Sequence, residues 1–65
     1  MDEIFTITFQ SGTTSIISPE INKKQAIKFI ADIGGQQIRK INLNGAMADS
    51  ETTLSILRAA RVFSN

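Results

Sequence analysis

The first apolar pattern in the chain is an alternation with a period of two. Residues 3–10 place two sets of side chains on opposite sides of an extended segment, namely Phe5, Ile7 and Phe9 on one and Ile4, Thr6 and Thr8 on the other. Alternating β-branched and aromatic residues are typical of a strand. We expect the phenylalanine face to point to the core, because it carries the larger apolar area. Residues 11–14 have turn chemistry, so residues 15–18 are expected to return as a second strand.

The next apolar residues follow a helical spacing. The stripe consists of Ala26, Ile27, Phe29, Ile30 and Ile33. Two starts are open: Ser18 as N-cap before Pro19, or Asn22 as N-cap with Gln25 completing a capping box. The pair Gly34-Gly35 is expected to end the helix, since glycine adopts the left-handed conformation that follows many helices.

A third strand is expected over residues 37–43. Ile41 and Leu43 share one face with Arg39, whereas Ile38 points the other way unless a bulge intervenes. Asn44-Gly45 is a strong turn signal, and we expect a small loop over residues 46–48 to follow it.

The last segment is predicted to be a second helix capped by Asp49 or Ser50. Its apolar stripe is Ile56, Leu57, Ala60 and Phe63. The alternation of Leu54, Ser55 and Ile56 leaves a strand from Glu51 onward as an alternative. We expect the three apolar residues outside this stripe to join the core in preference to lining a partner groove; they are Met47, Leu54 and Val62.

These elements predict one small α+β domain over residues 1–65. The expected architecture is a three-stranded antiparallel or mixed sheet with two helices on one face, in the order ββαβα. Two helices on one side leave the other sheet face open. That open face carries Thr6 and Thr8 and few charges, so we expect it, or an edge strand, to contact a second copy of the chain.

The amino-acid composition limits how a domain of this size can be stabilised. The chain has 65 residues and contains no Cys and no His. Domains this small are marginally stable and often add a disulfide, a metal or a second subunit. Without thiol or imidazole groups the first two supports are removed, which favours a homo-oligomer.

The same absence argues against catalysis. The acidic pairs Asp2/Glu3 and Asp49/Glu51 are explained by a solvated chain start and a helix N-terminus. We therefore expect no enzyme, no catalytic residues, no metal site and no cofactor. The acidic start and the lack of a long apolar run predict a soluble cytoplasmic protein that does not act at a membrane.

These observations lead to a non-catalytic module that binds another protein and self-associates, such as a regulator or inhibitor of the accessory type that phages and mobile elements encode. The alternative is a small nucleic-acid-binding protein with a basic helix face, although a net charge of +1 does not favour it. The candidate interaction surface consists of Thr6, Thr8, Lys23, Lys24, Lys28, Arg58 and Arg61.

Overall fold

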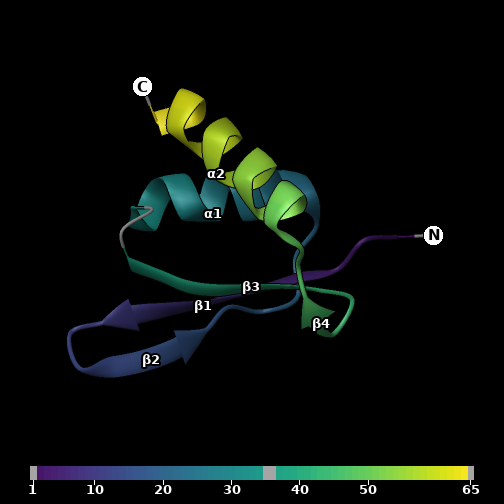
Figure 1. Ribbon diagram of the computed structural model, residues 1–65. Coiled ribbons are helices and arrows are strands. Elements are labelled where there is room, and N and C mark those ends of the chain that lie inside the picture. The colour runs from purple at the N-terminus through teal and green to yellow at the C-terminus, as the bar shows by residue number, and fades with distance from the viewer. Residues whose placement is uncertain (1, 35–36, 65) are drawn as a thin grey trace.

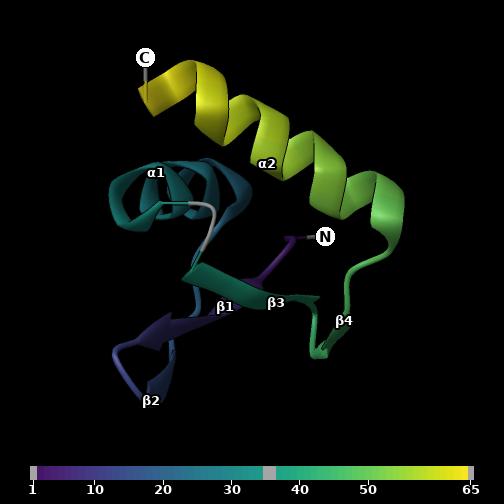
Figure 2. The ribbon, with the colours of Figure 1, turned by 60° about the vertical axis from the view of Figure 1, so that its left-hand side comes forward.

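The protein is an α+β fold in which both helices lie on the same side of one antiparallel sheet (Figures 1 and 2). The computed structural model describes residues 2–34 and 37–64. Its elements are β1 (Phe5–Ser11), β2 (Thr14–Ile17), α1 (Lys23–Ile33), β3 (Ile38–Leu43), β4 (Ala46–Met47) and α2 (Ser50–Ser64). The predicted α+β class is confirmed, and the segment from Glu51 is a helix.

The sheet has four strands in the order β2-β1-β3-β4, so the predicted three-stranded sheet and ββαβα order are corrected to ββαββα. The expected loop after Asn44-Gly45 begins instead with the short strand β4. Asn44 and Gly45 both have positive φ, at 53° and 85°, and Leu43 pairs with Ala46 across them. A two-residue turn of this kind joins paired strands. The strand was missed because both of its residues are exposed and show no apolar alternation.

A β-bulge corrects the faces expected for β3. Thr8 pairs with Lys40, but its neighbour Phe9 pairs with Ile38, so Arg39 is the extra residue on β3. Ile38 consequently packs against the core, on the side of Phe9. Arg39 does not share the core face of Ile41, and its Nε donates a hydrogen bond to Oε1 of Gln10 at 3.2 Å.

The start of α1 follows the second of the two sequence alternatives. Oδ1 of Asn22 accepts a hydrogen bond from the Gln25 amide at 2.8 Å, and Oε1 of Gln25 accepts one from the Asn22 amide at 3.0 Å. An earlier start is prevented because Ile21 is still extended and exchanges two main-chain hydrogen bonds with Phe5. At the other end α1 stops at Gly34 as expected, but Gly34 combines a positive φ of 84° with a ψ of 131°, which is not the expected left-handed conformation. Gly35 lies outside the described residues.

Ser18 holds the end of the hairpin instead of capping a helix. It is buried, and its Oγ accepts a hydrogen bond from the amide of Ile7 at 2.9 Å and donates one to the carbonyl of Pro19 at 3.0 Å. Its own amide donates to the carbonyl of Ile7 at 2.8 Å. A buried polar group with these partners satisfies main-chain groups that would be costly to leave unpaired.

The core lies between the sheet and the two helices. Its buried apolar residues are Phe5, Ile7, Ala26, Ile30, Ile41, Ile56 and Ala60. Phe9 and Phe29 add an edge-to-face ring contact with centroids 5.4 Å apart. Phe63 was expected in this core but is 59% exposed. The expectation that Met47, Leu54 and Val62 are core residues is also wrong, because all three are exposed.

Asp49 caps α2. Its Oδ1 accepts a hydrogen bond from the Thr52 amide at 2.8 Å, and its carbonyl accepts one from the Thr53 amide. The hydrogen bonds from Thr52 lower the pKa of the Asp49 carboxyl, because they stabilise its ionised form.

We expect this cap to make stability depend on pH. A carboxyl whose pKa is lowered by folding stabilises the folded state above its unfolded pKa of about 3.9, and this contribution is lost as pH falls through the lower folded pKa. Asp49→Ala should therefore lower the melting temperature at neutral pH, with a smaller loss in strongly acidic buffer. Asp49→Asn keeps a capping oxygen and should melt close to the wild type at neutral pH. Equal losses for Asp49→Ala at all pH values would contradict this assignment.

Candidate interaction surface

Thr6 and Thr8 lie on the open face of the sheet, as the alternation predicted. Thr6 is paired with Asn42 and Thr8 with Lys40 across β1 and β3. Directly paired residues place their side chains on the same face of a sheet. Both threonines are half-buried and lie on the two central strands of the sheet.

The neighbouring strands add apolar side chains to this face. Ile17 pairs with Thr8 from β2, and Met47 pairs with Asn42 from β4. Ile17 is 67% exposed and Met47 is 73% exposed. We call the set Thr6, Thr8, Ile17, Lys40, Asn42 and Met47 the open face.

Ile17 and Met47 were absent from the candidate residues chosen by sequence. The alternation showed that Ile16 and Ile17 point to opposite faces, but the choice between them depends on the register with β1. The two-residue connection that leaves Ser11 paired with Thr14 fixes this register. For Met47 the signal was the Asn44-Gly45 turn, which places it beside β3.

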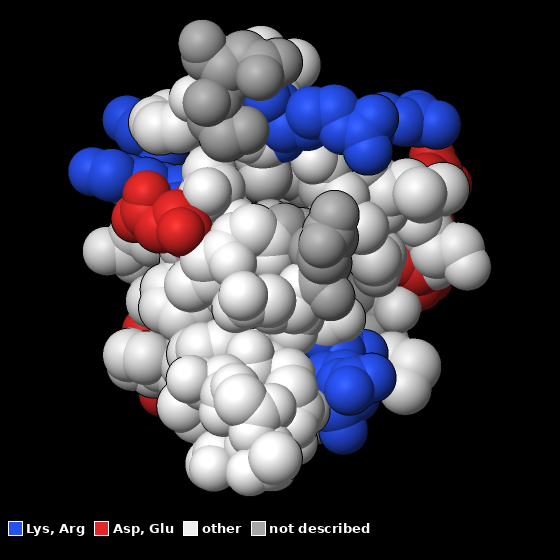
Figure 3. Space-filling model, turned by 90° about the vertical axis from the view of Figure 1, so that its left-hand side faces the viewer, with Lys and Arg blue, Asp and Glu red and all other residues white. Residues whose placement is uncertain are grey.

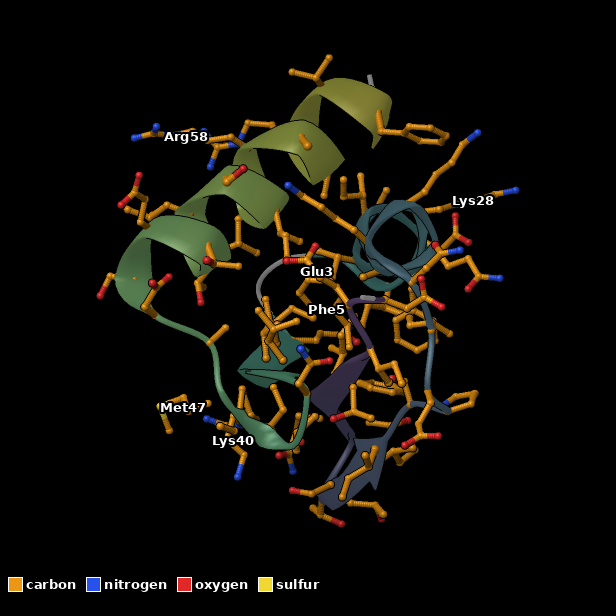
Figure 4. The ribbon with its side chains drawn as sticks, turned by 90° about the vertical axis from the view of Figure 1, so that its right-hand side faces the viewer. Glu3, Phe5, Lys28, Lys40, Met47 and Arg58 are labelled. Carbon is orange, nitrogen blue, oxygen red and sulfur yellow. The ribbon has the colours of Figure 1, made fainter. Side chains whose placement is uncertain are left out.

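The hairpin that supplies much of this surface is uncharged. Residues 4–19 include no Asp, Glu, Lys or Arg. In Figure 3 the charged side chains gather mainly over the helices in the upper half, while the lower part of the molecule, where the hairpin lies, is largely white. Lys40, from β3, is the charged member of the open face. It lies two residues before Asn42, which pairs with Met47, so Lys40 and Met47 are diagonal neighbours on this face (Figure 4).

Two of the basic candidates, one from each helix, point away from one another. Lys23, Lys24 and Lys28 are exposed on α1, and Arg58 and Arg61 are exposed on α2. Figure 4 shows Lys28 and Arg58 extending to opposite sides of the helical layer. A nucleic-acid surface needs positive charge gathered along one groove or face. Lys28 and Arg58 therefore do not lie together on one basic face of this kind.

Acidic side chains gather at a different place, beside the start of α1. A depression of about 530 Å³ is lined there by Asp2, Glu3, Ile4, Glu20, Ile21, Asn22 and Gln25. Among the residues that the structure describes, no group of three acidic side chains is arranged to hold a metal ion. Asn22 and Gln25 already use their amide groups in the helix cap. The described lining of this depression therefore does not point to a ligand site.

Within residues 2–34 and 37–64, neither helix combines the length and apolar character needed to cross a bilayer. No protein family, curated protein or solved structure matches the chain.

Proposed function

We propose that this protein is a non-catalytic protein-interaction module that contacts its partners through the sheet side of the molecule, namely the open face and the uncharged hairpin. The single observation that carries the proposal is the exposure of Ile17 and Met47 on a sheet face that neither helix covers. Ile17 and Met47 lie on the two edge strands of the sheet, on either side of the polar centre of the open face. An uncovered face that combines exposed large apolar side chains with polar ones favours protein binding.

The distribution of charged residues also indicates that the sheet side makes the contact with partners. Interface centres are depleted of charged residues, whereas protein surfaces in general are rich in them. Residues 4–19 carry no charge, while the outer surfaces of α1 and α2 carry both signs. We therefore expect the helix lysines to stay in contact with solvent and the sheet side to contact the partner.

The side chains present in the sequence also favour binding over catalysis. It contains no His and no Cys, the residue types most used for proton transfer and thiol nucleophiles near neutral pH. A small module that binds without catalysis would act as a regulator or inhibitor by occupying a surface of its partner. We propose a regulatory or inhibitory role of this kind for the protein.

The test compares two variants that change net charge equally on different surfaces. The open-face variant combines Thr8→Glu with Met47→Glu, and the helix variant combines Lys24→Gln with Lys28→Gln. Lys40 is paired with Thr8 and is a diagonal neighbour of Met47, which limits repulsion between the two introduced glutamates. Lys24, Lys28 and Met47 are exposed, where most substitutions change stability by less than about 0.5 kcal/mol, whereas Thr8 is half-buried. Both variants are therefore compared with the wild type by circular dichroism, and capture is interpreted for variants that keep its spectrum.

The immobilised proteins are then used to capture partners from the native host, with identification by mass spectrometry. Partners held by the wild type should also be held by the helix variant and should be lost by the open-face variant, with an affinity decrease of about ten-fold or more. Capture that survives the open-face changes but fails with the lysine changes would refute the proposal.

A further inference from the structure

The outer edge of β2 is an unpaired strand edge. β2 is the first strand in the sheet order, and its four residues are all exposed. In Figures 1 and 2 no described element lies beyond β2, which is the strand farthest from the helices. A strand in this position presents main-chain N–H and C=O groups to any chain that approaches it.

The hydrogen bonds of the hairpin identify which groups face outward. The Ser18 amide donates to the carbonyl of Ile7, so this amide points inward to β1. Main-chain direction alternates along a strand, so Ile16 and Thr14 also point inward. The N–H and C=O groups of Ser15 and Ile17 therefore point away from β1, toward solvent.

Apart from its length of four residues, this edge lacks the features by which sheets avoid pairing with other chains. Such edges are usually short, charged, bulged or interrupted by proline. The opposite edge strand, β4, has only two residues. β2 has four residues and carries neither a charge nor a proline. The register shift in the sheet lies between β1 and β3 and leaves the pairing of β2 with β1 regular.

We infer that β2 pairs antiparallel with β2 of a second copy of this chain, about a two-fold axis at Ile16. This inference deepens the proposed function, on which it rests, by naming the partner and the mode of contact. In this register Ser15 lies opposite Ile17 of the second copy, and each such pair exchanges two main-chain hydrogen bonds. The four outward amides and the four outward carbonyls of the two Ser15–Ile17 pairs are then all hydrogen-bonded.

Neighbouring registers use these groups less completely. An axis at Ser15 places Ile17 opposite Thr13, which lies in the hairpin turn. An axis at Ile17 places Ser15 opposite Pro19, which has no N–H to donate. The register centred on Ile16 is therefore the one that the sequence and the hairpin geometry select.

Charge favours a second copy as the occupant of this edge. Self-pairing brings residues 14–17 of both copies together without placing like charges opposite one another, because the segment has none. A net charge of +1 per chain adds little repulsion between copies. At the axis, Ile16 would meet its own symmetry mate on the helix side of the extended sheet, with 39% of its surface available in the single chain.

The first test removes the outward amide of Ser15 without changing the inward ones. Light scattering on a sizing column, over a range of concentrations, should show wild-type dimers. Ser15→Pro removes two of the four intermolecular hydrogen bonds and should raise the dissociation constant about ten- to one-hundred-fold. Proline is compatible with an edge strand where its missing N–H would face outward.

The matched control is Ser15→Ala, which loses the same hydroxyl group, and its 3.3 Å contact with Gln10, but keeps the amide. It should dimerise like the wild type. Dimers that persist equally in Ser15→Pro would overturn the edge pairing, as would a wild-type protein that stays monomeric at every concentration. Neither result removes the proposed function, which is tested by partner capture with the open-face variant.

A second pair of variants tests the axis and does not use proline. Ile16→Lys and Ile16→Glu should each dimerise weakly, because two like charges face one another at the axis. An equimolar mixture at low salt should form mixed dimers, which native mass spectrometry distinguishes by mass. Random pairing alone makes mixed dimers twice as abundant as either homodimer, so a mixed fraction that does not exceed this two-fold ratio would contradict an axis at Ile16.

Discussion

Replacing Phe5 by alanine is expected to remove a large part of the protein's stability. Phe5 is fully buried, and it joins β1 both to Leu43 of β3 and to Ile21 before α1. Truncating a buried phenylalanine costs about 3–5 kcal/mol. At about 0.05–0.15 kcal/mol per residue, a chain of 65 residues has a total stability of roughly 3–10 kcal/mol. The loss is therefore a large part of the whole.

Phe63→Ala is the matched control for this prediction. It removes the same side chain from a position that is 59% exposed, so the expected change is within about 0.5 kcal/mol. Urea unfolding followed by circular dichroism measures both. Similar losses for the two variants would contradict the exposure of Phe63. They would instead indicate that Phe63 packs in the core, as its helical spacing in the sequence predicts.

The second large effect is expected for Ile56→Ala, which should lower the free energy of unfolding by about 2–5 kcal/mol. Ile56 is fully buried and belongs to the same core cluster as Ile30 of α1 and Ile7 of β1. Its removal would leave a cavity where the second helix meets the rest of the fold. Urea unfolding again supplies the measurement.

Leu54→Ala is the control that separates a helix from a strand. In a strand, residues 54 and 56 would share one face and both substitutions would be costly. In α2 they point in different directions, and Leu54 is 49% exposed. The loss for Leu54→Ala should therefore be well below that for Ile56→Ala. Equal losses would favour the strand.

Much of the fold was predictable because local patterns and tertiary packing agree. The alternation of Phe5 and Ile7 fixed the core face of β1, and the capping box of Asn22 and Gln25 gave one of the two proposed starts of α1. These signals are short-range, so they operate before any tertiary contact is known. They left the choice between Ser18 and Asn22 open, because a pairing of Ile21 with Phe5 decides it.

The features that the sequence did not predict depend on long-range register. The position of Ile38 depends on a bulge that appears only when β3 is aligned with β1. The exposure of Phe63 depends on how far α2 extends beyond the packed part of the core, which helical spacing alone does not report. In the candidate surface, alternation identified Thr6 and Thr8, whereas the exposure of Ile17 and Met47 depends on strand pairing.

The most direct test of whether the sheet side makes the contacts uses a photo-reactive phenylalanine analogue at one position at a time in the native host. Positions 17, 28 and 58 sample the open face, the outer side of α1 and the outer side of α2, and all three native side chains are exposed. Illumination should give cross-linked products from position 17 and little from positions 28 and 58. Products from position 28 or 58, with none from position 17, would contradict the account.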